Sequence, residues 1–225
     1  PICHVKISFE IPVYTADATG LGTLKLLESI RQLRINPKIY IAGSSEMYGD
    51  VTSKFQNEKT PFNPRSPYGV SKVFSFYIGK NYRESYKMFI CNGILFNHES
   101  PERGENFVTR KISLGVASIK LGLKKKLILG NLNARRDWGY AKDYVEGMYL
   151  MLQQKKPDDY VLATGKTYSV REFCKLAFAE VGLDWKKYVV VDKKFYRPSE
   201  VNYLRGDSSK AKKILNWKHK TNFKS

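Results

Sequence analysis

The sequence predicts an α/β fold built around a parallel sheet. Apolar runs alternate with amphipathic stretches along the chain, which is the pattern of strands alternating with helices. The two clearest apolar runs each end in a polar segment, as strands do at the carboxyl edge of an open parallel sheet. With 225 residues, 42% of them hydrophobic, the chain can bury a substantial core in one or two domains.

The first half of the chain is predicted to contain two helices and two buried strands. A proline-rich loop precedes the second helix, because proline interrupts both helix interiors and central strands. In chain order, we expect a helix over residues 19–34, a strand over 38–43, a helix over 68–86 and a strand over 88–96.

Each of these strands leads into residues that can do chemistry. Ser44 and Glu46 come after the first strand, and Asn97 and His98 come after the second. The carboxyl ends of parallel strands share one edge, where flanking helices also point their amino termini. We therefore expect both polar segments to lie in one cleft.

The second half is predicted to continue the alternation with shorter and less regular elements. Ser169 and Glu172 have the Ser-x-x-Glu spacing of a capping box, which marks the start of a helix. We expect helices over 107–121, 141–154, 169–181 and 208–216, strands near 126–130 and 160–164, and a strand with an ordered loop within 186–205.

Several classes of protein are disfavoured by composition. No apolar run approaches the roughly 18 residues of a membrane span, and the opening residues lack the apolar core of a signal peptide, so we expect no membrane partner. The three cysteines lie far apart, which argues against a disulfide framework and favours the cytoplasm. The three histidines show no paired-ligand spacing, so we expect no metal site.

The net charge of +18 would attract polyanions in a salt-dependent way. Most of the excess lies after residue 110, in lysines of predicted helices and turns, and no nucleic-acid-binding motif surrounds them. A solvated surface is the simpler interpretation, and we expect no specific nucleic-acid partner. A non-catalytic module that binds polyanions stays open as an alternative function.

One tyrosine has the spacing of a catalytic base. Of the 15 tyrosines, only Tyr68 has a lysine four residues later, Lys72, which is one turn on along a helix. The lysine charge would stabilise tyrosinate and make the phenol a usable base, while a nearby hydroxyl such as that of Ser44 would bind the substrate oxygen. The alternative is a surface tyrosine beside a solvated lysine, which the polar turn at Ser44 disfavours.

Short sequence blocks spread over nearly the whole chain resemble the GDP-mannose 4,6-dehydratases, a family of extended short-chain dehydrogenases/reductases. The blocks NHESP and NFVTRK are the most typical of that family. The matching blocks are SSEMYG (44–49), PRSPYG (64–69), NGILFNHESP (92–101), NFVTRK (106–111), RDWG (136–139), AKDYV (141–145) and YRPSEV (196–201).

The resemblance implies an NADP-dependent lyase that converts GDP-mannose to GDP-4-keto-6-deoxymannose, a step toward GDP-fucose. Tyr68, supported by Lys72, would take the proton from O4 as NADP⁺ accepts the C4 hydride. Glu46 would remove the C5 proton as water leaves C6, and Ser44 would polarise the C4 oxygen. Family enzymes usually carry threonine at the position of Ser44, so the hydroxyl is kept.

The resemblance also implies two sets of binding residues. Arginine offers a planar donor fork suited to phosphate, and a carboxylate can accept hydrogen bonds from ribose hydroxyls. For the arginines the alternative is a surface charge or structural ion pair, and for the histidine a structural brace of its loop. The NADP-contacting set is Tyr14, Tyr68, Lys72, His98 and Arg103. The GDP-sugar set is Asn97, Lys111, Arg136, Arg197 and Glu200.

The fold implied by the resemblance is a Rossmann-type doubly wound parallel sheet with a smaller carboxyl-terminal α/β part. We expect a partial NADP-binding domain over 1–105 and 137–165, interleaved with a nucleotide-sugar-binding domain over 106–136 and 166–225. The opening residues match the family well inside its length, so we expect the first strands and the glycine-rich turn for the pyrophosphate to be missing. The intact protein is expected to be a homo-oligomer, a dimer or tetramer.

The closest rival function is another nucleotide-sugar dehydratase or epimerase of the same superfamily. Glu46 separates the two, because dehydration needs a base for the C5 proton. A simple C4 epimerase has no such requirement and usually carries another residue there.

Overall fold

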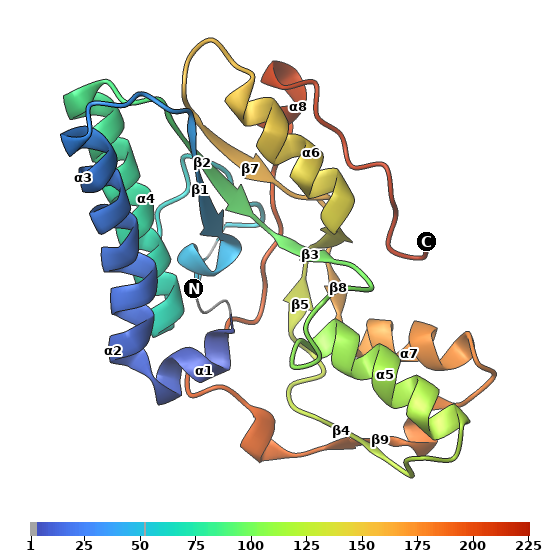
Figure 1. Cartoon of the computed structure of the whole chain (residues 1–225). Helices are drawn as coiled ribbons and strands as arrows, with labels where there is room; N and C mark the ends of the chain where they lie inside the picture. The colour runs from blue at the N-terminus through green and yellow to red at the C-terminus, as the bar shows by residue number, and fades with distance from the viewer. Residues whose placement is uncertain (1–3, 52) are drawn as a thin grey trace.

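The centre of the computed structural model, which describes residues 4–51 and 53–225, is a parallel sheet with strand order β1-β2-β7 (Figure 1). Register pairs Ser44 with Leu95, and Leu95 with Leu162, so the three strands end at one edge. The middle strand is buried along its whole length because both faces are covered. The strands are β1 (Ile39–Ser44), β2 (Ile90–Leu95) and β7 (Asp159–Leu162).

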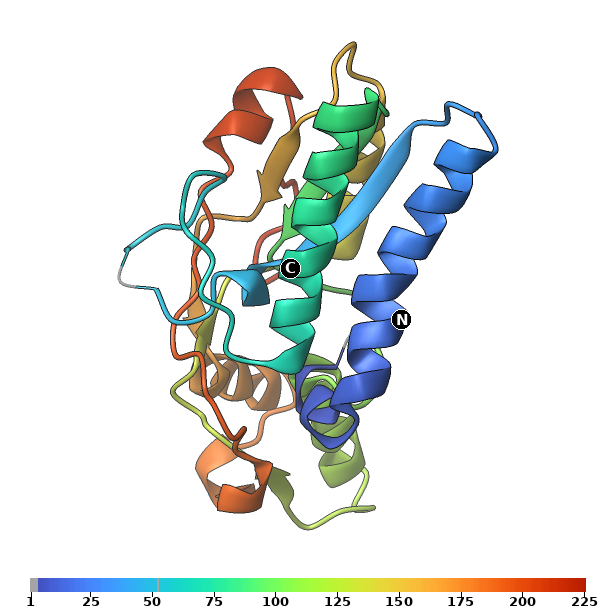
Figure 2. The same cartoon turned by 90° about the vertical axis from the view of Figure 1, so that its left-hand side faces the viewer.

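Helices pack on both faces of this sheet, so the predicted doubly wound parallel α/β fold is confirmed (Figures 1 and 2). Alternate side chains of β2 point to opposite faces. Ile90 packs with Leu27 and Tyr82, whereas Cys91 packs with Met151 on the other side. The helices of the first face are α3 (Gly22–Gln32) and α4 (Pro67–Tyr86), and those of the second are α6 (Ala141–Leu152) and α8 (Ser209–Ile214).

The helix predicted over 19–34 begins earlier than expected. Pro12 starts a helical turn, since its missing N–H is no loss at a helix start, and a π-helical segment then leads into α3. The apolar periodicity alone did not reveal these first turns. The elements are α1 (Val5–Glu10), α2 (Pro12–Thr15) and the π-helix Ala16–Leu21.

A second lobe, at the bottom of Figure 1, has a core of its own, which includes Ile112, Leu127 and Phe178. The predicted capping box is present: Glu172 N donates to Ser169 Oγ over 3.1 Å, and Ser169 N donates to the Glu172 carboxylate over 2.6 Å. The lobe is formed by α5 (Val108–Lys120), α7 (Val170–Ala179), β4 (Leu127–Leu129) and β9 (Val189–Val191).

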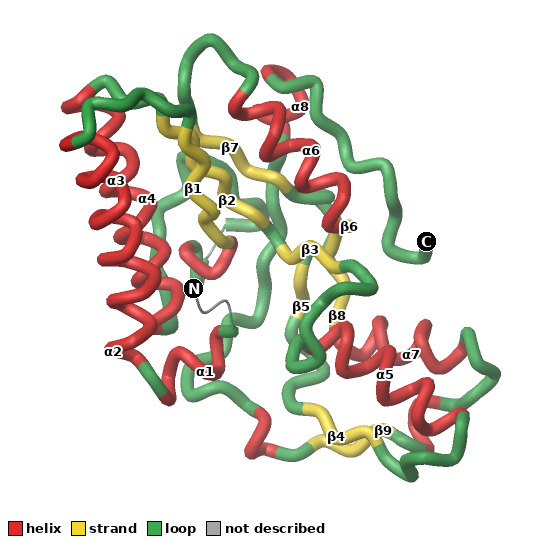
Figure 3. Tube along the Cα trace, in the orientation of Figure 1, coloured by secondary structure: helices red, strands yellow, loops and turns green. Residues whose placement is uncertain are grey.

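Two short strand pairs join the sheet to the second lobe (Figure 3). Strands this short carry no readable apolar period, so they were not predicted. Trp138 is buried in the core of the second lobe. The pairs are β3 (Asn97–Glu99) with β6 (Trp138–Tyr140), and β5 (Arg135–Arg136) with β8 (Tyr168–Ser169).

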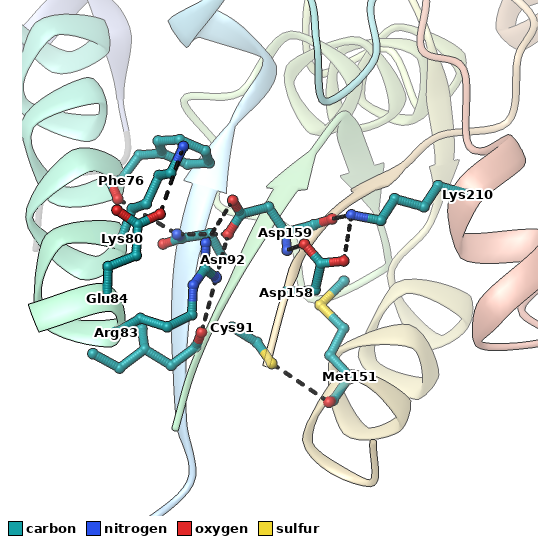
Figure 4. A network of polar contacts seen from close by, with 11 residues as sticks. Phe76, Lys80, Arg83, Glu84, Cys91, Asn92, Met151, Asp158, Asp159 and Lys210 are labelled. Carbon is teal, nitrogen blue, oxygen red and sulfur yellow. Dashed lines mark hydrogen bonds and ion pairs between the residues drawn. The ribbon is translucent and has the colours of Figure 1, made fainter. Parts of the chain in front are cut away.

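A polar network ties α4 to the beginning of the central sheet, away from the edge where the strands end (Figure 4). Arg83 donates to both carboxylate oxygens of Asp159, over 2.7 and 2.9 Å, and to the carbonyl oxygen of Ile90 over 3.0 Å. Asn92 of β2 donates to the same aspartate over 2.8 Å. The network therefore connects a helix with two neighbouring strands.

Within the described part of the chain, no helix is both long and apolar enough to cross a membrane. In that same part, no group of three His, Cys, Asp or Glu side chains is arranged to hold a metal ion. Cys91 and Cys174 are buried free thiols, and burial raises the pKa of the Cys174 thiol to about 12. That thiol is therefore protonated near neutral pH and is not an activated nucleophile.

Candidate active site

The end of β1 positions Ser44 and Glu46. Ser44 is the last residue of the strand, and its Oγ accepts a hydrogen bond from Glu46 N over 3.2 Å. This bond caps the 3-10 turn Ser45–Met47, in which Glu46 is buried. The hydroxyl and the carboxylate therefore sit on one fixed turn at the carboxyl edge of the sheet.

The first turn of α4 brings Tyr68 to the same place. Ser66 caps the helix by accepting from Gly69 N over 3.0 Å, and Pro67 occupies the first helical position. A Cβ added at Gly69 would lie 2.8 Å from the carbonyl oxygen of Glu46, so the helix start lies directly against the Glu46 turn. The structure thus brings the buried Tyr68 close to the Ser44 and Glu46 turn.

Lys72 lies one turn further along α4. Its Nζ donates to the carbonyl oxygen of Ala42 in β1 over 2.8 Å and lies 5.7 Å from the centroid of the Tyr68 ring. The strand therefore fixes a positive charge beside the phenol. A charge in this place favours the tyrosinate form, which is the requirement for a tyrosine base.

His98 in β3 is held on two sides. Its Nδ1 lies 2.8 Å from the carbonyl oxygen of Phe96 and must be the protonated nitrogen there, since a carbonyl can only accept. Its ring stacks on Tyr144 with centroids 5.0 Å apart. Burial lowers the pKa of His98, and the charge of Arg103 lowers it further. The ring is therefore neutral near pH 7, and Nε2 is an acceptor.

Arg103 follows the same strand and is held by Glu99 and Phe107. Its Nε lies 3.1 Å from the Glu99 carboxylate, and its guanidinium lies 3.6 Å from the centroid of the Phe107 ring. Thr109 also donates to Glu99. The guanidinium is thereby fixed in orientation by an ion pair and a stacking contact.

Two predicted substrate residues converge on Glu46 from distant parts of the chain. Nη1 of Arg197 lies 3.2 Å from Glu46 Oε1, and Nη2 of Arg136 lies 3.9 Å from the same oxygen. Burial lowers the pKa of Arg136, and the Glu46 carboxylate opposes that shift; arginine stays charged at neutral pH. Glu200 accepts from Arg197 N over 2.9 Å, so it shapes the loop that carries this arginine.

The remaining predicted residues are Lys111, Asn97 and Tyr14. Lys111 Nζ lies 4.1 Å from the centroid of the Phe195 ring, and burial, followed by the charge of Lys6, lowers its pKa. Asn97 begins β3, where it pairs in register with Trp138. Tyr14 in α2 is 59% exposed, and its side chain is not drawn into the Glu46 cluster.

Sequence reasoning missed four residues of the site. Ser66 had a readable signal, because a serine directly before a helix-starting proline is a common cap. Ser8, which accepts from Tyr68 N over 3.2 Å, had none. Lys6 lies 5.4 Å from the centroid of the Phe195 ring, and neither residue had a local signal for this contact.

Comparison with known sequences places this geometry in a family. The GDP-mannose 4,6 dehydratase family model matches residues 2–225. GDP-mannose 4,6 dehydratase 1 of Arabidopsis thaliana is 57% identical over 224 residues, which are 98% of this chain and 62% of that protein. The Homo sapiens GDP-mannose 4,6 dehydratase is 51% identical over 239 residues, covering 98% of this chain and 64% of that protein. The chain thus spans less than two thirds of the length of these relatives.

Solved structures agree with the fold. RMD from Pseudomonas aeruginosa, complexed with NADPH, superposes with a TM-score of 0.89 at 22% identity, over 99% of this chain and 75% of that one. The Thermus thermophilus UDP-glucose 4-epimerase in complex with NAD superposes with a TM-score of 0.85 at 25% identity. The match covers 99% of this chain and 71% of that one. These structures share the sheet and its helices, and the sequence comparison supplies the closer relationship: the chain belongs to the GDP-mannose 4,6 dehydratase family.

Proposed function

We propose that this site removes water from GDP-mannose to give GDP-4-keto-6-deoxymannose, as part of a full-length enzyme. The observation that carries the proposal is the contact between the Glu46 turn and the start of α4, which puts a carboxylate base beside a Tyr-Lys pair. Oxidation at C4 needs the tyrosine, and elimination across C5 and C6 needs a second base. Membership of the family supports the same reaction.

In the first half-reaction, Tyr68 accepts the proton of the C4 hydroxyl while the C4 hydrogen leaves as hydride. Lys72 favours the tyrosinate through its charge, and the Ser44 hydroxyl donates to the developing C4 ketone oxygen. The product of this step is a 4-keto sugar. Its carbonyl acidifies the hydrogen on C5, which makes the next proton transfer possible.

In the second half-reaction, Glu46 removes the C5 proton and passes it to the C6 hydroxyl, which leaves as water. C6 then receives the hydride that the cofactor would return, and C5 takes a solvent proton through the same carboxyl group. Glu46 is buried on a capped turn, so its approach to the sugar is defined by the backbone. The net change is loss of one water, with no external oxidant consumed.

A nicotinamide cofactor would supply the hydride acceptor and donor in this reaction. Lys72, His98 and Arg103 fit such a group: a fixed ammonium, a neutral imidazole with a free acceptor nitrogen and an oriented guanidinium stand along the carboxyl ends of β1 and β2. Tyr14, which is largely exposed, is assigned to the same group. NADP rather than NAD is proposed, in line with the NADPH bound to the Pseudomonas aeruginosa protein.

The GDP part of the substrate is assigned to the side of the site that carries the positive charges of Arg136, Arg197 and Lys111. Arg136 and Arg197 are proposed for the diphosphate because guanidinium forks match phosphate oxygens. Lys111 adds a third positive charge, while Asn97 and Glu200 offer groups for sugar and ribose hydroxyls. Support comes from the convergence of Arg136 and Arg197 on Glu46 and from the position of Lys111 over Phe195.

Three wider features belong to the proposal. The division into an NADP domain (1–105 and 137–165) and a sugar domain (106–136 and 166–225) is supported by the second lobe's own core, although Val201 and α8 pack in the cores of the central sheet. A homo-oligomer is supported by exposed apolar side chains on α3 and α4, the helices that face the viewer in Figure 2. The scattered cysteines support a cytoplasmic location.

The test is product formation. The protein, as the 225-residue chain and in a full-length form, is incubated with GDP-mannose and NADP⁺, and the nucleotide sugar is analysed by mass. Loss of one water in the full-length form supports the proposal. An unchanged sugar mass, with conversion of UDP-glucose to its C4 epimer instead, would contradict it and favour the rival epimerase.

Glu46→Gln provides a second test of the same proposal. Oxidation at C4 should still occur, but the C5 proton has no base, so reduced cofactor accumulates to about one equivalent per site. The accumulation is followed by the near-ultraviolet absorbance of NADPH in the full-length form. Normal turnover in this variant would remove Glu46 from its role.

A further inference from the structure

The surroundings of Glu46 carry more positive than negative charge. Among the ion pairs between described residues, Arg136 and Arg197 both pair with Glu46, which contributes one carboxylate for two guanidinium groups. The side chains are 7%, 29% and 11% exposed for Arg136, Arg197 and Glu46 respectively, so water screens them poorly. This site therefore has surplus positive charge that an anion would balance.

Neighbouring residues increase this surplus. Lys6 and Lys111 both lie over the ring of Phe195, two residues before Arg197. The Glu200 carboxylate accepts from Arg197 N and also acts on Arg136 through its charge, so Lys6 and Lys111 supply the excess. Burial is the main cause that lowers the pKa of Lys111, and the charge of Lys6 adds to the shift. A ligand with several negative oxygens fits this group of side chains.

The pairing of Glu46 is also geometrically incomplete. One oxygen, Oε1, serves both arginines, at 3.2 and 3.9 Å. Arg83 and Asp159, by comparison, share two short bonds of 2.7 and 2.9 Å. Two guanidinium groups can donate to several more acceptors than one carboxylate oxygen provides. A diphosphate would use this donor capacity better than Glu46 does.

We propose that Glu46 occupies, in the ligand-free protein, the place of a diphosphate on Arg136 and Arg197, and that ligand binding releases it. This inference rests on the proposed function. The nucleoside diphosphate takes over the guanidinium groups, and the carboxylate turns from them toward the sugar. Arg136 and Arg197 are then positioning residues for the base as well as anion-binding residues. The base is exposed to the reacting carbon once substrate is in place.

The exchange predicts that removing the Glu46 charge strengthens diphosphate binding. The 225-residue chain, its Glu46→Gln variant and a Glu10→Gln control are titrated by calorimetry with GDP and with guanosine. Glu10 is an exposed carboxylate on α1, so the control removes one negative charge from the same region without touching either arginine. Glu46→Gln should tighten GDP binding by roughly tenfold, because a partly buried charged hydrogen bond no longer has to be broken.

Guanosine affinity should stay the same in all three proteins, and Glu10→Gln should change GDP affinity by less than about twofold. In an Arg197→Ala background, the gain from Glu46→Gln should shrink. A smaller gain would show that Glu46 and the diphosphate compete for the Arg197 guanidinium. A general effect of removing one negative charge would give the same gain with and without Arg197. Circular dichroism spectra that superpose show that each variant is folded.

Equal GDP affinity in the parent chain and Glu46→Gln would overturn the exchange, as would an equal gain for guanosine. The proposed function fails differently. If UDP binds and GDP does not, the proposed substrate class is wrong, and titration with pyrophosphate then decides the exchange. Tighter pyrophosphate binding by Glu46→Gln supports it, and unchanged binding overturns it.

Discussion

The two ends of the central sheet each hold an arginine and carboxylate cluster, and the clusters differ in balance. At the amino-terminal end, one guanidinium, that of Arg83, meets one carboxylate, that of Asp159, through two bonds. At the carboxyl end, two guanidinium groups meet the single carboxylate of Glu46. Figure 4 shows the first cluster, in which Asn92 donates to the same aspartate.

The balance between guanidinium groups and carboxylates distinguishes the structural ion pair from the binding site in this sheet. The Arg83 pair satisfies its own charges, so it holds α4 against β2 and β7 and requires no further partner. The Glu46 cluster has excess donors and lies beside Tyr68, at the edge where parallel sheets bind ligands. Changes at the amino-terminal end should therefore reduce stability, and changes at the carboxyl end should reduce function.

The largest expected effect is at the carboxyl end. Tyr68→Phe removes the base for C4 oxidation while keeping the buried ring, so turnover by the full-length form should fall by about a thousandfold or more. GDP binding and the melting temperature should change little. Steady-state rates check the loss of turnover, and thermal denaturation checks the unchanged melting temperature. A large loss of stability would contradict the assignment of function to the carboxyl end of the sheet and stability to the amino-terminal end.

At the amino-terminal end, Arg83→Met leaves a largely buried aspartate without its partner. The free energy of unfolding should fall by about 3 kcal/mol, measured by urea denaturation of the 225-residue chain. Replacing Asp159 by leucine in the same molecule should restore part of this loss, since no uncompensated charge then remains. A change in GDP affinity of the folded variant would show that this cluster is not purely structural.

Arg197→Ala should have a smaller effect, on binding. Loss of a charged hydrogen-bond donor should raise the KM for GDP-mannose by roughly tenfold, with a smaller change in kcat. Arg65→Ala is a matched control, because Arg65 donates to Ser199 in the same loop region and does not contact Glu46. An unchanged KM in Arg197→Ala would remove this residue from the diphosphate site.

The smallest expected effect lies away from both ends. The hydrogen bond from Ser169 N lowers the pKa of Glu172, so the carboxylate stabilises the fold at pH values above about 4.5. This contribution is lost as pH falls through the lowered folded-state pKa. Glu172→Gln should cost about 0.5 kcal/mol at pH 7 and less at pH 3, by urea denaturation. A difference independent of pH would contradict this origin.

The sequence predicted the sheet end of the site better than the side that faces it. Strands β1 and β2 and helix α4 are long enough to show their periods, and Ser44, Glu46 and Tyr68 lie at their ends. Their closeness follows from parallel topology alone. The capping box at Ser169 was readable for a similar reason, because its spacing is local.

The side of the site that carries Arg136 and Arg197 depends on contacts between residues far apart in the sequence. Arg136 lies on a two-residue strand and Arg197 in a loop, so neither has a pattern that points to Glu46. The family resemblance indicated a substrate role for both arginines but not their pairing with the base. Lys6 reaches Phe195 across the whole chain, and such a contact cannot be inferred without the fold.

The central claim is that Glu46 exchanges the C5 proton during dehydration. The most direct measurement is to run the full-length form with GDP-mannose and NADP⁺ in deuterium oxide and to locate deuterium in the product by NMR. The account predicts one deuterium at C5, with the hydrogen added to C6 coming from C4 of the same sugar. A dehydrated product with no deuterium at C5, or deuterium delivered to C6 as hydride, would contradict it.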